Sequence, residues 1–295
     1  MKKLVIALVA GVLLTTSAFA QENCKVIRMG FNPAQDATKV LASARPIANY
    51  LEETIRGVEV KATVAQDYRG LIEAMRSRQL DFAWLNPVGY VDAKREGVAE
   101  VLLKSAREGG PYYWAALIVR SDSRIKSEKD LQGSSIAWVD PNSAAGYTFP
   151  KATLLSKGID PDKTFGQTSL SAGGHDAVVY SVLNGTVDVG AVFSNNTRGT
   201  SGAWTQYLKD VAQQQKIRVL LYSKPIPGDT VSVRTGFKNS CRDTVTLVTN
   251  ALLAMRSQNT TRQMLRDLYR IEYLVSAKDS DYDIVREAQA AAAKK

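Results

Sequence analysis

One histidine in 295 residues limits the acid–base chemistry that this chain can perform. His175 would have to serve any nucleophile as its base, and its neighbour Asp176 gives only a weak pairing signal, because adjacent residues on a helix point in different directions. The sequence contains no G-x-S-x-G elbow, no Walker loop and no G-x-G-x-x-G after its first predicted strand. We therefore predict no enzyme activity, no catalytic residue and no cofactor.

A different chemistry, the binding of an anion by backbone N–H groups, fits a turn near the middle of the chain. The segment Asp140-Pro141-Asn142-Ser143-Ala144-Ala145-Gly146 follows a predicted strand at 136–139 and precedes a predicted helix at 147–155. A helix N-terminus presents unpaired N–H groups and a partial positive charge. Ser143, Ala144 and Ala145 are therefore ligand-binding candidates. The same segment also fits an ordinary capping turn in which Ser143 is the N-cap.

Two further turns follow the predicted strands at 26–31 and 81–85, and a third, Ser171-Ala172-Gly173-Gly174-His175, precedes a predicted helix; all three carry small or amide-bearing residues. Open α/β sheets bind ligands at such turns. His175 opens a helix behind two glycines, so a binding role and a structural role are both open for it. Most aromatic residues near these turns are expected in the core, and we place two of them in the wall of the pocket. The candidates from these turns are Gln35, Asn86 and His175, and the wall residues are Tyr90 and Tyr113.

The hydrophobic pattern predicts the elements that position these turns. Apolar runs typical of strands are followed by apolar residues at helical spacing, and this alternation repeats along the chain. It is typical of a largely parallel α/β sheet. The predicted strands cover residues 26–31, 58–64, 81–85, 112–120, 136–139, 187–192, 219–222 and 231–233.

Two breaks divide the pattern into two lobes. Gly109-Gly110-Pro111 precedes a restart of the alternation, and Pro225, Pro227 and Gly228 break it again. The helices after residue 233 have no strands of their own to cover, so we expect them to pack on the first lobe. Two crossings between lobes would form a hinge. The predicted organisation is a signal peptide at 1–20, lobe 1 at 21–113 and 225–295, and lobe 2 at 114–224.

The first twenty residues have the parts of a secretory signal peptide. Lys2 and Lys3 precede an apolar run that ends in the small-x-small sequence Ala18-Phe19-Ala20. The run is too short to span a hydrocarbon core about 30 Å thick, so we predict cleavage near Ala20 and a periplasmic protein. The residues before Cys24 are polar where a lipoprotein signal has small or apolar ones, so we expect no lipid anchor.

Composition and charge narrow the range of partners. A hydrophobic content of 45% excludes a disordered chain. The formal net charge of +9 becomes +7 when Lys2 and Lys3 leave with the signal peptide. The Lys and Arg residues are scattered rather than clustered, which together with export argues against nucleic acid. A small anionic ligand is the partner that we predict.

Cys24 and Cys241 are the only cysteines, and an exported chain carries them into an oxidising compartment. We predict that they pair in one disulfide, the alternative being two free thiols. Neither has another metal-binding residue at close spacing, so we predict no metal site.

Around these turns the sequence resembles the phosphate, phosphite and phosphonate periplasmic binding proteins of ABC transporters. The resemblance covers nearly the whole mature chain, and the order of the shared segments is more specific than any one of them. They are Arg45-Pro46-Ile47-Ala48-Asn49-Tyr50-Leu51-Glu52, Asp67-Tyr68, Asp81-Phe82-Ala83-Trp84, Val139-Asp140-Pro141-Asn142-Ser143 and Gly174-His175-Asp176-Ala177.

The resemblance implies an α/β type II periplasmic binding protein fold, with two lobes that each have a mostly parallel sheet and are joined by a two-crossing hinge. It implies a small oxyanion, of the phosphite, phosphonate or phosphate type, held in the cleft and delivered to the permease of an ABC importer. Some relatives serve sensor kinases, so the periplasmic domain of a kinase is the alternative partner. A secreted α/β enzyme is the least favoured hypothesis, and we expect a monomer.

Two departures from the family pattern concern the ligand. The family usually has Ser-Thr-Ser-Gly where this chain has Ser143-Ala144-Ala145-Gly146, and two missing hydrogen bonds would weaken binding by about 0.5–1.5 kcal/mol each. Family members that bind aminophosphonates hold the ammonium group with acidic side chains, whereas Ser194-Asn195-Asn196 is neutral. Asn195 is therefore a ligand-binding candidate, and we expect a simple oxyanion rather than a zwitterion.

Overall fold

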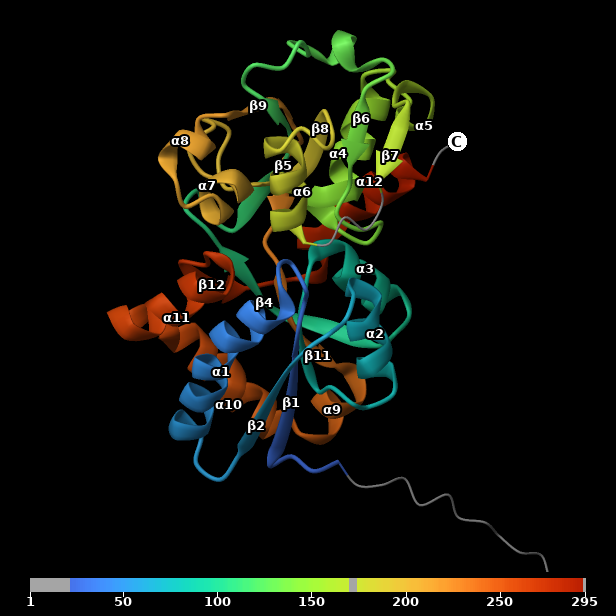
Figure 1. Cartoon of the computed structure of the whole chain (residues 1–295). Coiled ribbons are helices and arrows are strands. Elements are labelled where there is room, and N and C mark those ends of the chain that lie inside the picture. Colours follow the sequence, from blue (N-terminus) through green and yellow to red (C-terminus); the bar gives the residue numbers. More distant parts are fainter. Residues whose placement is uncertain (1–21, 170–173, 294–295) are drawn as a thin grey trace, which may run out of the picture.

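The computed structural model describes residues 22–169 and 174–293. These residues form two α/β lobes, which lie one above the other in Figure 1. The predicted signal peptide at 1–20 lies outside the described residues, and so do residues 171–173 of the turn before His175. Within the two described ranges, no helix has both the length and the apolarity needed to cross a bilayer.

Lobe 1, the lower lobe in Figure 1, contains a six-stranded sheet. Most residues of its central strands are buried. Its strands are, in spatial order, β2 (Glu59–Val64), β1 (Val26–Phe31), β3 (Phe82–Leu85), β11 (Thr230–Arg234), β4 (Ala99–Ala106) and β12 (Tyr273–Ser276). All four residues of β3 are buried, which suits an apolar strand covered on both faces. β2 lies at the edge and alternates between more and less exposed residues.

Among the described residues, three of the six helices of lobe 1 begin at a capping side chain. The six helices are α1 (Ala37–Thr54), α2 (Tyr68–Arg76), α3 (Pro87–Arg95), α9 (Thr235–Ser240), α10 (Arg242–Ala254) and α11 (Asn259–Tyr269), with 3-10 turns η3 (Met255–Ser257) and η4 (Asp279–Tyr282). Asp36, Asp67 and Asn86 accept hydrogen bonds from backbone N–H groups in the first turns of α1, α2 and α3. As predicted, α10 and α11 pack on lobe 1, against α1.

Lobe 2 is built around β5, the longest strand of its sheet. Its strands are, in spatial order, β10 (Ile226–Pro227), β5 (Tyr112–Arg120), β8 (Val189–Ser194), β6 (Ser135–Ala137) and β7 (Gln167–Ser169), and β9 (Ile217–Tyr222) also pairs with β5. Its helical segments are η1 (Glu128–Leu131), the π-helical turn η2 (Ala144–Thr148), α4 (Phe149–Ser156), α5 (Pro161–Thr164), α6 (His175–Leu183), α7 (Ala203–Tyr207) and α8 (Val211–Gln214). β8 is buried along its whole length.

Both sheets are mixed, whereas the sequence predicted mostly parallel ones. β1 runs parallel to β2 and β3, and β6 runs parallel to β7 and β8, as strand-helix-strand units require. The other neighbouring strands pair antiparallel. In every antiparallel pair except β12–β4, one of the strands is β5 or β11, which enters its sheet directly from the opposite lobe without a covering helix to reverse the chain.

The lobes are joined at the two predicted breaks and at a third place. β4 leads to β5 through Gly109 and Gly110, and β10 leads to β11 through Gly228. The third connection follows β12: α12 (Asp283–Ala292), which the sequence assigned to lobe 1, packs mainly on α4 in lobe 2 (Figure 1). Gln289 of α12 also donates to Asp92 of α3 over 3.1 Å. The expected two-crossing hinge therefore has an additional crossing, because α12 turns its apolar stripe toward lobe 2.

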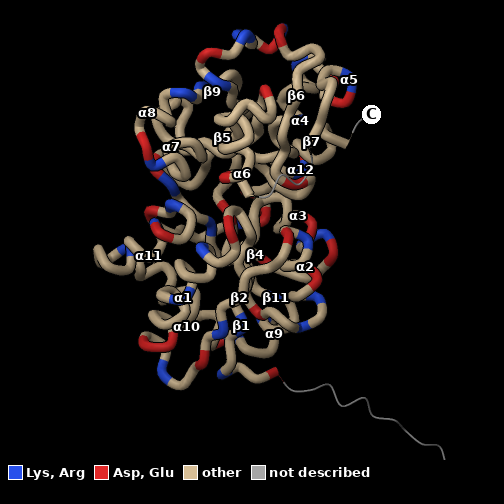
Figure 2. The backbone as a smooth tube through the Cα atoms, in the orientation of Figure 1, with Lys and Arg blue, Asp and Glu red and all other residues tan. Residues whose placement is uncertain are grey.

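Cys24 and Cys241 form the predicted disulfide, with their Cα atoms 5.4 Å apart. The bond ties the segment before β1 to the junction of α9 and α10, so it closes within lobe 1. Figure 2 shows the basic and acidic residues interspersed over both lobes, as the scattered Lys and Arg positions in the sequence indicated.

Candidate functional site

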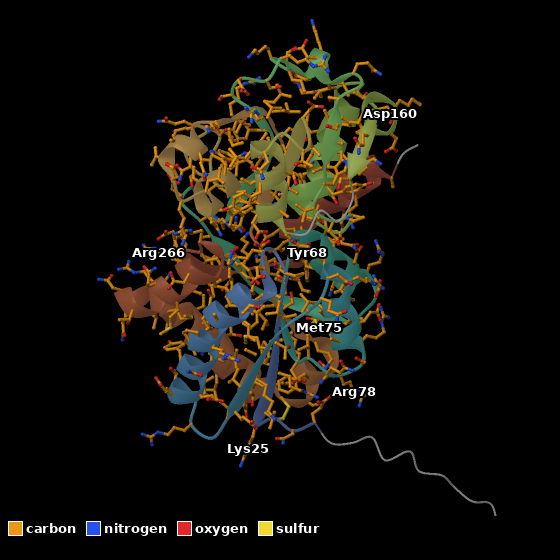
Figure 3. The ribbon with its side chains drawn as sticks, in the orientation of Figure 1. Lys25, Tyr68, Met75, Arg78, Asp160 and Arg266 are labelled. Atoms are coloured by element: carbon orange, nitrogen blue, oxygen red, sulfur yellow. A yellow bond between two sulfur atoms is a disulfide. The ribbon has the colours of Figure 1, made fainter. Side chains whose placement is uncertain are left out.

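A small cavity lies between the two lobes. The volume available to the centres of water-sized atoms is about 30 Å³. One water molecule needs about 10–15 Å³ on this scale, so the cavity is a few atoms wide. Figure 3 labels one lining residue, Tyr68, where the lobes meet. Lobe 1 contributes Asn32, Ala34, Tyr68, Asn86, Arg107, Asp229 and Tyr269, and lobe 2 contributes Tyr113, Ser143, Ala144, Ala145, His175, Phe193, Gln206 and Tyr207.

Six of the nine predicted site residues line this cavity. The polypeptide brings them together from four segments that are far apart in the sequence, because the turns after β3, β6 and β7 and the start of β5 face one another across the gap between the lobes. These six residues are Asn86, Tyr113, Ser143, Ala144, Ala145 and His175.

The other three predicted residues lie outside the cavity wall. Gln35 lines a neighbouring groove. Tyr90 is not a wall residue: its hydroxyl donates to Asp279 over 2.7 Å and its ring packs edge-on against Tyr282, because α3 turns this side chain into the core. Asn195 stands one layer back, where its side-chain oxygen accepts a hydrogen bond from Arg107 over 3.2 Å.

The turn after β6 combines the two roles that the sequence left open for it. The Ser143 hydroxyl accepts a hydrogen bond from the N–H of Gly146 over 3.1 Å, so Ser143 is an N-cap. The N–H groups of Ala144 and Ala145, at the start of the continuous segment η2–α4, donate to no protein acceptor among residues 22–169 and 174–293. Both alanines line the cavity. The turn therefore presents two free donors at a helix N-terminus, where anions are stabilised.

His175 is an uncharged group in the cavity wall. Burial lowers its pKa to about 3, with a smaller contribution from the nearby charge of Arg107. Its ring packs edge-on against Phe193 at 5.0 Å between centroids. Its Nδ1 atom is buried and has no hydrogen-bond partner within the described ranges. The imidazole is therefore a neutral polar group facing the cavity.

The cavity wall contains a buried ion pair that was not predicted from the sequence. Arg107 directly follows β4 and donates from Nη2 to the Asp229 carboxylate over 2.9 Å. The side chains of both residues are less than one-tenth exposed. Burial raises the pKa of Asp229, and the positive charge of Arg107 opposes that shift. The sequence did contain an indication of this pair, because the two residues flank the predicted breaks at Gly109-Gly110 and Pro227-Gly228.

Tyrosine hydroxyls supply much of the remaining polar lining. Burial raises the pKa of Tyr68, Tyr113, Tyr207 and Tyr269, so all four remain neutral. Tyr269 donates to the backbone carbonyl of Asn32 over 2.8 Å. Of the four, only Tyr113 was predicted, although Tyr68 follows the capping Asp67 in one of the shared segments.

Several polar side-chain atoms in the wall lack a partner in the part of the chain that the structure describes. Buried polar groups are normally hydrogen-bonded, so such a cluster indicates a place where a polar ligand completes the network. The charges of Arg107 and Asp229 balance, so this ion pair adds no net charge to the wall. The unpartnered atoms are Asn32 Oδ1, Arg107 Nε, His175 Nδ1 and Gln206 Oε1.

The lobes touch each other beside the cavity. Asn86 of lobe 1 donates from Nδ2 to the carbonyl of Asn142 in lobe 2 over 3.0 Å. Gly174 of lobe 2 lies so close to lobe 1 that a Cβ atom there would stand 2.8 Å from Gln35 Cα and 3.0 Å from the carbonyl oxygen of Ala34. The two lobes are therefore in direct contact beside the cavity.

Comparison with known proteins identifies relatives of this chain. Residues 29–282 match the family described as "ABC transporter, phosphonate, periplasmic substrate-binding protein". The phosphonates-binding periplasmic protein of Escherichia coli K12 is 27% identical over 237 residues, which cover 79% of this chain and 68% of the relative. The phosphate-import protein PhnD of Mycolicibacterium smegmatis is 31% identical over 178 residues, which cover 57% of this chain and 55% of the relative.

A solved structure shares the fold. PhnD1 of Prochlorococcus marinus in complex with methylphosphonate superposes with a TM-score of 0.76 at 20% identity, and the match covers 91% of this chain and 98% of that one. The likeness confirms the predicted two-lobed α/β architecture.

Proposed function

Because the chain belongs to the family of periplasmic substrate-binding proteins of ABC phosphonate transporters, we propose that it captures a small oxyanion between its lobes and delivers it to the permease of an ABC importer. The type II periplasmic binding protein fold provides the clamp. Hinge closure around a ligand is the motion by which such two-lobed proteins sequester it.

One observation carries the proposal: free hydrogen-bond donors meet in an enclosed cavity of suitable size. The N–H groups of Ala144 and Ala145 and the Nε of Arg107 have no acceptor among the described residues. A volume of about 30 Å³ for atom centres suits a small tetrahedral anion. Donors that are already oriented and buried bind an anion without a further ordering cost.

The relatives indicate the class of oxyanion. Those reported above are named for phosphonates and for phosphate import, and one solved relative holds methylphosphonate. Ala144 and Ala145 offer backbone N–H groups without hydroxyls, so we propose a phosphite, a small alkylphosphonate or phosphate, bound chiefly through the main chain.

We propose binding without turnover. A general base works best when its pKa lies near the working pH, and the pKa of His175 is lowered to about 3 by burial. The only imidazole of the chain is therefore a poor base at neutral pH. The family is one of substrate-binding proteins, which agrees with this chemistry.

For the route to the periplasm, we propose export with signal cleavage near Ala20 and a monomeric mature chain that begins at Gln21. The E. coli relative is periplasmic by name, and so is the family. Intact mass of the secreted protein tests the cleavage site, and size-exclusion chromatography with light scattering tests the monomer.

A thermal-shift panel on the mature protein tests the function. The ligands are phosphate, phosphite, methylphosphonate, ethylphosphonate, sulfate and arsenite. A ligand at a hundred times its Kd adds about 2.7 kcal/mol to the free energy of unfolding, so at least one phosphorus oxyanion should raise the melting temperature, with isothermal titration calorimetry giving the affinity. The proposal fails if none of the phosphorus compounds shifts the melting temperature.

A further inference from the structure

The guanidinium of Arg107 is enclosed by groups that suit an organic cation. Its Cζ atom lies 4.5 Å from the ring centroid of Tyr113 and 5.2 Å from that of Phe193. Its Nη2 donates to Asp229 over 2.9 Å and its Nη1 donates to Asn195 over 3.2 Å. Two aromatic rings, a carboxylate and an amide oxygen together resemble the sites in which proteins bind cationic ligands.

Two of the enclosing residues, Asn195 and Tyr113, are also held by contacts that do not involve Arg107. The backbone N–H of Asn195 donates to the carbonyl of Ser201 over 2.9 Å, and its Nδ2 donates to the Ser201 hydroxyl over 3.0 Å. Tyr113 lies in β5, where it pairs with Ile226 of β10. The backbone and the neighbouring residues therefore position Asn195 and Tyr113 whether or not a guanidinium lies between them.

Arg107 also borders the cavity where we place the oxyanion. Its Nε is buried and has no acceptor among the described residues, so it remains a donor for the anion. The same side chain thus pairs with Asp229 on one side and faces the ligand on the other.

We propose that Arg107 permanently fills a cation subsite formed by Tyr113, Phe193, Asn195 and Asp229, and thereby restricts the cavity to oxyanions without an ammonium group. This inference rests on the proposed function, because it takes the adjoining cavity as the oxyanion site. An ammonium group in the cavity would find its natural partner, the Asp229 carboxylate, already paired. It would also be repelled by the guanidinium, which has the same charge.

Size-matched ligands test the wild-type protein. Ethylphosphonate and aminomethylphosphonate have the same number of heavy atoms and differ in a methyl group and an ammonium group. Calorimetry on the mature wild-type chain should give at least a tenfold lower Kd for ethylphosphonate. Equal affinities, or a preference for aminomethylphosphonate, would overturn the proposal.

The variant Arg107→Ala empties the subsite while leaving Asp229 in place. The preference should then reverse by about 100-fold toward aminomethylphosphonate, and 2-aminoethylphosphonate should bind more tightly than propylphosphonate. The double variant Arg107→Ala/Asp229→Asn is the matched control, because it removes both charges and should not favour the ammonium compounds. A reversal that persists in the double variant, or no reversal in the single one, contradicts the assignment.

Cation rescue tests the subsite without any oxyanion. If Arg107→Ala lowers stability because it leaves Asp229 unpaired, methylguanidinium at millimolar concentration should restore the melting temperature of the single variant and leave that of the double variant unchanged. Absence of this difference would overturn the proposal even if phosphonates bind. Failure of every oxyanion to bind the wild type, with rescue intact, would instead contradict only the proposed function.

Discussion

The backbone N–H of His175 donates to the backbone carbonyl of Ala34 over 3.2 Å, and this hydrogen bond joins the two lobes. His175 begins α6 of lobe 2, whereas Ala34 belongs to the turn after β1 of lobe 1. Both residues line the cavity. The same two residues therefore take part in the contact between the lobes and in the wall of the candidate ligand site. The approach of the lobes and the completion of the site are coupled for this reason.

Gly174→Ala should weaken ligand binding by about tenfold or more. The new Cβ atom would lie 2.8 Å from Gln35 Cα and 3.0 Å from the Ala34 oxygen, both of them backbone atoms of the other lobe. Gly174 has a φ of −73°, which alanine adopts without strain. The atom nearest to the new Cβ, Asp176 Oδ1 at 2.6 Å, is the end of a side chain that can turn aside, whereas the backbone of lobe 1 cannot, so the main effect should be on the approach of the lobes. Overpacking of this kind costs about 1–3 kcal/mol, and calorimetry with methylphosphonate measures the loss.

Gly70→Ala serves as the control for the glycine substitution. A Cβ atom at Gly70 meets only Asp67 and Ala65 of its own lobe, at ordinary contact distances of 3.4 Å and 3.7 Å. Its affinity should equal that of the wild type. Equal affinities for all three proteins would show that closure does not depend on the approach of Gly174 to lobe 1.

Ala144→Pro should remove one main-chain donor from the site. Proline is tolerated at the first position of a helix, where it lacks the N–H group, and Ser143 has an extended conformation compatible with a following proline. The loss of one hydrogen bond to a charged ligand corresponds to about 1.5–3 kcal/mol, or roughly 10–100-fold in Kd for methylphosphonate.

Ala144→Ser keeps that N–H and adds a hydroxyl, so it should bind methylphosphonate as tightly as the wild type or up to about tenfold more tightly. The melting temperatures of the two ligand-free variants report whether folding is intact. If Ala144→Pro binds normally, the ligand is not held by the main chain of this turn.

The sequence predicted those parts of the site that local chain segments encode. Ser143, Ala144 and Ala145 could be found because a strand, a capping residue and a helix follow one another in the sequence. Arg107 and Asp229 were missed because their pairing depends on how the two crossings lie side by side, and no periodic pattern records that. The error at Tyr90 has a similar origin, since the direction of its side chain depends on the packing of α3 against η4.

The fold shows the same division. The alternation of apolar residues predicted the parallel units around β1 and β6, which are formed within a lobe. The antiparallel pairing of β11 with β3 and β4 depends on a strand that arrives from the other lobe, and the position of α12 depends on contacts with α4. When a strand joins a sheet from a distant part of the chain, the local pattern of apolar residues does not indicate which strands it will pair with.

The neutral His175 should make stability fall in mild acid. Its pKa is lowered to about 3 by burial, whereas in the unfolded chain it lies near 6.5. Between these pH values the unfolded state binds a proton that the native state does not, so the free energy of unfolding decreases as the pH falls from about 6.5 toward 3. At pH 5 the loss attributable to this residue is about 2 kcal/mol.

His175→Asn isolates that contribution, because the carboxylates of the chain titrate in both proteins. Urea unfolding at pH 7 and at pH 5 should give a smaller decrease for the variant than for the wild type. Parallel decreases in the two proteins would mean that the imidazole is not held neutral in the native state.

Removing the disulfide should destabilise the protein without changing its ligand site. Cys24 and Cys241 are 217 positions apart, and cross-linking a loop of that length restricts the unfolded chain strongly. We expect the double variant Cys24→Ser/Cys241→Ser to lose about 2–5 kcal/mol of unfolding free energy, measured by urea denaturation.

The affinity of the double cysteine variant at 25 °C should match that of the wild type, because the bond lies at the opposite end of lobe 1 from the cavity. Figure 3 shows this separation, with Lys25, the neighbour of Cys24, far from Tyr68. A reducing agent applied to the wild type should reproduce the loss of stability. If the variant loses affinity in proportion to its stability, the disulfide supports the site rather than the core of lobe 1.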